Sequence, residues 1–370
     1  MDGYVALTRA RQRAEEQARA AADEYEDFLA AVVNLLFSSI FFEANLPRRS
    51  TALQALLSLH EIVIARGVFN PRWMNSVNDG VERLLYIVEN DSYENNKESA
   101  LSVLDKFWPL TSVDSKNLFG DRDILGEVLS SCDSPNPIRS TTAAYQLRLL
   151  TRTKSYGKTA LETLSLLSDR LAAQVAVAQR DLSEAAREHP MFGLLFCMRA
   201  VVIDSGDLGE GAREWAARVR ELCAAVSAIV SEVLNSDSPE GQMGSGCDGQ
   251  TLLLCCWRSS KEVSHLLAAL IDKLPHGELG AGAILSVADV KSIGDFFTRL
   301  LGTTVHRGAF EQVGLGTCNL KYSLEINSID AVHAGLHRVL NDLRIHVALG
   351  RNRVPRLSRG HARRDIGCDR

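Results

Sequence analysis

Apolar residues recur at spacings of three, four and seven along most of this chain, and polar residues fill the positions between them. This is the period of amphipathic helices, and no segment alternates convincingly like a half-buried strand. Proline, glycine or asparagine marks the breaks. The pattern predicts an all-α fold with helices over residues 5–44, 48–66, 72–89, 94–107, 117–131, 137–152, 157–188, 191–204, 208–235, 250–274 and 286–301.

Two of these helices carry more specific expectations. No helix breaker lies between Gly157 and Glu188. This predicts one helix over residues 157–188, about 48 Å long at 1.5 Å per residue, with the helices 191–204 and 208–235 packed against it. The helix that follows Leu285 opens with Ser286 and Asp289, spaced as an N-cap and an acidic N3 residue.

A weak internal repeat favours a particular architecture. Apolar pairs that begin at Ala52, Ala100 and Ala144 recur at offsets of 48 and 44 residues. This spacing is typical of HEAT or armadillo helix pairs, in which each pair buries its apolar face against its neighbours. An irregular helical domain is the alternative.

Composition and charge indicate a soluble globular chain. Of its 370 residues, 46% are hydrophobic and 24% charged, enough to bury a sizeable core. The net charge is -5, but residues 338–370 hold nine Arg and three Asp, which gives +6 there and leaves -11 for the rest. The acidic body argues mildly against a nucleic-acid surface, whereas the Arg-rich end could contact phosphate without sequence specificity.

The cysteines point to a reducing compartment. Most of the eight lie in apolar helical patterns, and no Cys-x-x-Cys pair supports a zinc or redox site. We therefore expect buried free thiols. The N-terminus does not resemble a secretory signal, and no apolar run reaches about eighteen residues. The expected location is the cytosol, without membrane insertion.

The usual catalytic motifs are absent from the sequence. It contains no P-loop, Gly-x-Ser-x-Gly elbow or His-Glu-x-x-His site, and no strand leads into Gly314-Leu315-Gly316. His333 and His337 are spaced like two metal ligands, but no third ligand is near, which favours two surface histidines. The trio His306, Arg307 and Glu311 could serve acid–base chemistry, although a helix start explains it better. We expect no enzyme, cofactor or metal ion.

The segment from Leu252 to Leu274 is unusual for its polar face. Cys256, Val263 and Leu267 belong to a buried stripe, while Arg258, Glu262 and His265 form a polar row beside Trp257. An Arg that precedes a Glu is the weaker orientation of an ion pair along a helix, so the row is not there mainly for helix stability. It lies either in solvent or between helices, or else it contacts a partner.

Several motifs in this chain resemble one known family. The stretch Cys255 to Ser264 resembles the Cys-Trp-Arg-x-x-Lys-Glu-Val-Ser signature of the thyroid adenoma-associated protein (THADA) family. Six further motifs follow the family order: Arg48-Arg49-Ser50, Tyr93 to Lys97, Ser140 to Tyr145, His189 to Gly193, Asn235 to Gly241 and His306 to Glu311. Together they cover roughly residues 35–315. After about Cys318 the resemblance is expected to fade, and the chain looks like an internal portion of a longer protein.

The resemblance implies a non-catalytic helical-repeat scaffold. Such a scaffold would bind an FtsJ-like ribose 2'-O-methyltransferase and help to present tRNA, so that the 2'-hydroxyl at anticodon-loop position 32 is methylated. The candidate partner-binding residues are Trp257, Arg258, Lys261, Glu262, His306, Arg307 and Glu311. The alternative is a protein-interaction scaffold without an RNA role, for example a regulator of a membrane calcium pump.

The expected organisation has four parts. Residues 1–34 form an N-terminal helical extension, and residues 35–235 form helical repeats. Residues 236–318 carry the Trp257 and His306 motifs, and residues 319–370 form a divergent Arg-rich tail.

Overall fold

The computed structural model describes residues 2–41, 43–62, 74–108, 123–153, 158–236, 248–277 and 282–326. Helices account for nearly all of these residues, so the all-α prediction is confirmed. In the described part the only strands are two short ones, β1 (His276–Gly277) and β2 (Leu285–Ser286), which pair in parallel. The chain divides into two compact units at Asp123. The four-part organisation expected from the sequence stays a prediction.

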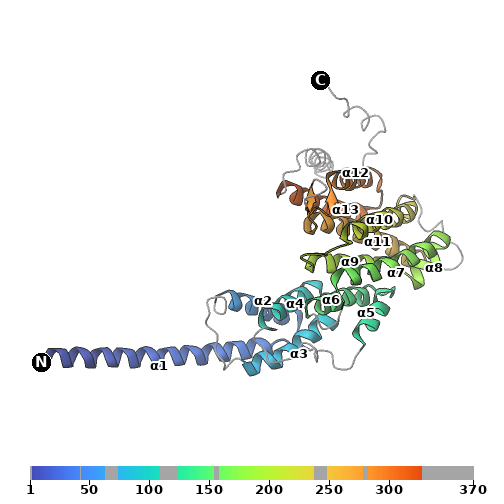
Figure 1. Cartoon of the computed structure of the whole chain (residues 1–370). Coiled ribbons are helices and arrows are strands. Elements are labelled where there is room, and N and C mark those ends of the chain that lie inside the picture. The colour runs from blue at the N-terminus through green and yellow to red at the C-terminus, as the bar shows by residue number, and fades with distance from the viewer. Residues whose placement is uncertain are drawn as a thin grey trace, which may run out of the picture. The chain divides into compact units, whose positions relative to one another are not determined.

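The first unit contains four described helices, drawn in blue to cyan in Figure 1. They are α1 (Asp2–Ser38), α2 (Leu46–Ile62), α3 (Met74–Asn90) and α4 (Glu94–Phe107). Helix α4, whose bounds agree with the prediction, packs on both α2 and α3, and α1 packs on α3 and α2. Leu53, Leu56, Leu101 and Leu104 lie in the core of this unit, since each is at most 2% exposed.

Two of the family-like motifs form a polar network inside this unit. Arg49 of α2 contacts Asp91 at 2.9 Å, and Ser50 donates a hydrogen bond to Asn96 of α4 at 2.7 Å. The Lys97 ammonium group donates to the Val88 carbonyl of α3 at 2.7 Å. Lys97 is 1% exposed, and this burial lowers its pKa to about 8. The motif residues therefore hold α2, α3 and α4 together.

The second unit contains nine described helices, drawn in green to orange-red in Figure 1. Helices α6, α9, α11 and α13 pack one against the next in that order, while α5, α7, α10 and α12 contact α6, α9, α11 and α13 respectively. The bounds are α5 (Ile124–Cys132), α6 (Pro137–Thr153), α7 (Ala160–Arg180), α8 (Leu182–Glu188), α9 (Phe192–Asp204), α10 (Ala212–Leu234), α11 (Gly249–Lys273), α12 (Val287–Thr303) and α13 (Arg307–Ile326).

The prediction of a single helix over residues 157–188 is wrong, because the helix is interrupted at Asp181. Asp181 has an extended backbone between α7 and α8, and its carboxylate accepts hydrogen bonds from the Ser183 and Glu184 amides at 2.8 and 3.0 Å. It is thus an N-cap inside what the sequence presents as a continuous helix. The expected packing of α9 and α10 against α7 is confirmed.

Other local expectations agree with the structure. Ser286 and Asp289 form the predicted capping box at the start of α12.

A serine lies among the buried residues of α7. The Ser168 hydroxyl donates a hydrogen bond to the Leu164 carbonyl at 2.7 Å and accepts one from the Trp215 indole of α10 at 2.9 Å. Ser168 is fully buried. These hydrogen bonds explain how a polar residue is accommodated between helices.

Candidate partner-binding site

Helix α11 carries the Trp257 segment and is held in place by core packing. It begins after Asp248, whose carboxylate accepts a hydrogen bond from the Thr251 amide at 2.8 Å. The helix then packs against α9, α10 and α13. Cys256, Val263 and Leu267 of the predicted stripe are at most 3% exposed. The orientation of the polar residues between them is therefore fixed by the buried face of the helix.

Arg258 is directed toward aromatic rings. Its guanidinium carbon lies 5.7 Å from the ring centroid of Phe192 in α9 and 5.6 Å from that of Trp257. Both distances allow a cation–π interaction. Arg258 therefore links α11 to the first residue of α9.

Glu262 is buried beside Arg199 of α9. One of its carboxylate oxygens lies 3.1 Å from Nε of Arg199, and the other lies 3.6 Å from Nζ of Lys261. The Arg199 guanidinium also lies over the Phe196 ring, 4.5 Å from its centroid. Only 8% of the Glu262 side chain is exposed, so its charge is compensated by α9 rather than by solvent.

His265 completes the polar row with a contact to α13. Its Nε2 lies 3.3 Å from the side-chain oxygen of Gln312. Arg258, Glu262 and His265 therefore all make contacts between helices, which agrees with one of the interpretations of this row. The sequence pattern does not identify Arg199 and Gln312 as partners of this row. The period of a helix indicates the face on which a residue lies, but not the helix that covers that face.

The start of α13 packs beside Trp257. A Cβ atom added at Gly308 would lie 3.0 Å from the indole nitrogen of Trp257, so a glycine allows this close approach. The Val305 amide donates to the Asn235 side chain at 3.1 Å. Phe192 and Gly308, from the motifs at 189–193 and 306–311, thus lie against Arg258 and Trp257 of α11, and Asn235 binds the residue that precedes His306.

His306, Arg307 and Glu311 act as parts of a helix start, as favoured from their spacing. The His306 ring nitrogen Nδ1 accepts a hydrogen bond from the Ala309 amide at 3.1 Å. Arg307 and Glu311 form an i,i+4 ion pair at 2.9 Å, with 90% and 55% of their side chains exposed. Two of the seven candidate residues are therefore accessible on the surface of α13. These contacts are those of a helix start, with His306 bound to the Ala309 amide and Arg307 paired with Glu311.

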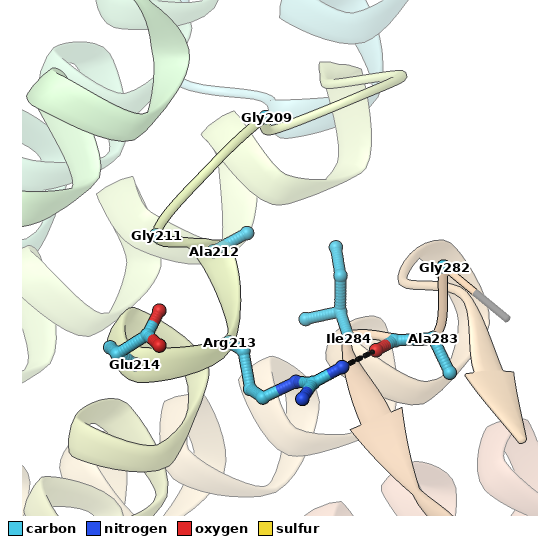
Figure 2. Close-up of a pocket in the computed structure, with 8 residues that line it drawn as sticks. All are labelled: Gly209, Gly211, Ala212, Arg213, Glu214, Gly282, Ala283 and Ile284. Atoms are coloured by element: carbon cyan, nitrogen blue, oxygen red, sulfur yellow. Dashed lines mark hydrogen bonds between the residues drawn. The ribbon is translucent and has the colours of Figure 1, made fainter. Parts of the chain in front are cut away.

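A small pocket lies elsewhere in the second unit, between the start of α10 and the residues before β2. Figure 2 shows the Arg213 guanidinium reaching across it to the Ala283 carbonyl, a hydrogen bond of 2.7 Å. The cavity volume is about 250 Å³, and Gly209 and Gly211 form part of the lining. None of the seven candidate residues lines this pocket.

Two other kinds of site, a metal centre and a membrane span, are absent from the described residues. No three His, Cys, Asp or Glu side chains in them gather closely enough to hold a metal ion. No described helix is long and apolar enough to cross a membrane. His333 and His337 lie outside the described residues. Five cysteines are buried thiols in the described part, as expected: Cys132, Cys197, Cys223, Cys255 and Cys256.

The described residues define a predominantly helical protein in which residues of several family-like motifs pack between neighbouring helices. A family model described as THADA/TRM732, DUF2428 matches residues 214–360. Together with the relatives below, this match confirms the resemblance to the THADA family that the motifs indicated. The matched residues continue past Cys318 to residue 360. The prediction that the similarity fades after about Cys318 is therefore wrong.

Three relatives carry the name tRNA (32-2'-O)-methyltransferase regulator THADA. The protein of Drosophila melanogaster is 31% identical over 350 residues, which cover 80% of this chain and 19% of that protein. The Mus musculus protein is 25% identical, with 82% of this chain and 21% of that protein covered, and the Homo sapiens protein is 23% identical, with 80% and 20% covered. This chain thus spans about a fifth of the length of these relatives. No solved structure matches.

Proposed function

We propose that this chain is a non-catalytic part of a regulator that supports 2'-O-methylation of tRNA at position 32. The observation that carries the proposal is the similarity over about 80% of the chain to proteins named as regulators of that methyltransferase. The partner is an FtsJ-like ribose 2'-O-methyltransferase, tRNA is engaged through the complex, and the location is the cytosol.

The arrangement of helices supports a scaffolding role. The succession of packed helices in the second unit is what a HEAT or armadillo solenoid would contain, and we propose that architecture for the chain. A ribose hydroxyl in a folded RNA must be positioned before it can attack a methyl donor. On this proposal the methyltransferase supplies the donor and the chemistry, and this chain supplies the placement.

We further propose that the seven candidate residues contribute in two ways. Arg307 and Glu311 are exposed and available for direct contact with the partner. We assign the same role to Lys261, whose side chain is half-buried. Trp257, Arg258, Glu262 and His306 are engaged with neighbouring elements. They would act by holding the α11 and α13 surfaces in place.

Co-purification of this chain with the FtsJ-like methyltransferase of the same organism tests the proposal. It should be done with and without tRNA and at two salt concentrations, because contacts to phosphate weaken strongly with salt. We expect a complex that forms without tRNA and survives the higher salt concentration. Failure of the folded, helical chain to bind in every condition would contradict the proposed role and favour the scaffold without an RNA function.

A further inference from the structure

Two buried thiols from different helices face one another in the second unit. Cys132 is the last residue of α5, and Cys197 lies in the middle of α9. Their sulfur atoms are 3.2 Å apart, and both residues have 0% exposure. Such a contact between residues 65 positions apart in sequence requires the two helices to approach closely.

A glycine on α9 permits this approach. A Cβ atom added at Gly193 would lie 2.2 Å from the Cys132 carbonyl oxygen, which is too close for any side chain. Gly193 and Cys197 are four residues apart in α9 and therefore on the same face of that helix. Because glycine has no side chain, the end of α5 can pack directly on α9 at Gly193, and the Cys132 sulfur then lies near that of Cys197.

The residue after Cys132 fixes the end of α5 from the other side. The Asp133 carboxylate accepts hydrogen bonds from Arg170 and from Gln174 of α7, the latter at 2.7 Å. The chain at Cys132 is thus held between α9 and α7. This placement is a property of the folded unit and not of a free loop.

We propose that Cys132 and Cys197 are a modification site that forms a reversible disulfide when a peroxide is the oxidant. The bond would join the end of α5 covalently to α9. Formation of the bond requires the sulfur atoms to approach by roughly 1 Å, since a disulfide bond is about 2 Å long.

The reaction balances with one hydrogen peroxide. One thiol loses its proton, and the thiolate attacks a peroxide oxygen. The O–O bond breaks to give a sulfenic acid and hydroxide, which takes up the proton to become water. The second sulfur then attacks the sulfenic sulfur, so that the S–S bond forms, the S–O bond breaks and a second water leaves. Two thiols lose two electrons and two protons in total, and the peroxide is reduced to two waters.

The folded unit limits the rate of this reaction. The hydrogen bond with Cys132, together with burial, raises the pKa of the Cys197 thiol well above its ordinary value. Little thiolate is therefore present, and neither sulfur is open to solvent. Helix α5 has only nine residues and packs on α6 and α9, so partial opening of this short helix would admit the oxidant.

Peptide mapping of the full chain after hydrogen peroxide treatment in native buffer tests the proposal. Trypsin releases Cys132 in residues 123–139 and Cys197 in residues 188–199, each with a single cysteine. We expect these peptides to be linked, with a loss of two hydrogens that dithiothreitol reverses. The oxidised chain should also melt several degrees higher than the reduced chain. Linkage only after unfolding in urea, or preferential linkage of Cys132 to another cysteine, would overturn the proposal.

Two variants control the experiment. Cys223→Ser removes another fully buried thiol and keeps the pair, so the 123–139 to 188–199 linkage should form as in the wild type. Cys197→Ser should lose that linkage and the rise in melting temperature on oxidation. An unchanged rise in the Cys197→Ser variant would show that the stabilisation arises elsewhere.

Discussion

The Glu262 carboxylate of α11 lies 3.1 Å from Nε of Arg199 in α9, with 8% and 18% of the two side chains exposed. Neither of these two atoms makes a well-directed hydrogen bond, so the contact is chiefly between charges. Removal of one partner leaves the other charge poorly compensated in a largely buried place. We expect Arg199→Ala or Glu262→Ala to lower the free energy of unfolding by about 2–3 kcal/mol, measured by urea unfolding with circular dichroism.

The double variant Arg199→Met with Glu262→Leu separates charge from packing. Because it removes both charges and keeps apolar volume, it should be more stable than either alanine variant. A double variant that is no more stable than the alanine variants would show that their loss of stability does not come from an unpaired charge.

Gly193→Ala tests the close approach of α5 to α9. Alanine favours a helix over glycine by about 1 kcal/mol, but its Cβ would lie 2.2 Å from the Cys132 carbonyl oxygen. We expect the clash to dominate and the melting temperature to fall. Gly314→Ala in α13 is the matched control, since no atom lies within 4 Å of the Cβ position there, and it should be neutral or stabilising. Similar effects of the two substitutions would contradict the packing of α5.

The stability of the first unit should depend on pH through Lys97. Its pKa is lowered from 10.5 to about 8 in the folded chain, so between these values the unfolded chain binds more protons. Stability therefore rises with pH across this window, by up to about 3 kcal/mol for a shift of this size. Urea unfolding from pH 7 to pH 10 should show a rise in the wild type relative to Lys97→Met. Parallel pH curves for the two proteins would argue against a buried ammonium group.

Two exposed ion pairs of the same geometry distinguish binding from stability. Arg307–Glu311 and Arg11–Glu15 are both i,i+4 pairs at 2.9 Å on helix surfaces. Each contributes at most about 0.5 kcal/mol to stability. We expect the double alanine variant at 307 and 311 to weaken binding to the methyltransferase at least about 10-fold, equal to about 1.4 kcal/mol, by calorimetry. The variant at 11 and 15 should bind like the wild type. Equal affinity of all three proteins would remove α13 from the binding surface.

Local patterns explain how much of this fold could be predicted. The period of apolar residues and the Ser286–Asp289 spacing depend on neighbours in sequence, and the structure agrees with both. The break at Asp181 was missed because aspartate does not interrupt a helical pattern by itself. Its capping role depends on the backbone leaving the helical conformation at that residue, which periodicity does not reveal.

The candidate site was predictable to a smaller degree. The polar row on α11 was recognisable from its spacing, but its partners Phe192, Arg199 and Gln312 come from other helices. Pairing of distant faces depends on the tertiary packing of the whole unit. Periodicity therefore located the residues and left open whether they face solvent, a neighbouring helix or a partner.

The Ser168 hydroxyl restricts how α7 and α10 can slide along one another. A shift of one helical turn would move the Trp215 indole away from Ser168 and leave its N–H group without an acceptor in an apolar environment. Contacts between leucine side chains alone would allow several alignments of similar energy. The hydrogen bond between Trp215 and Ser168 can form in only one of them, and its loss makes the others less stable. The buried serine therefore selects a single register for α7 and α10, which pack against α9 and α11 respectively.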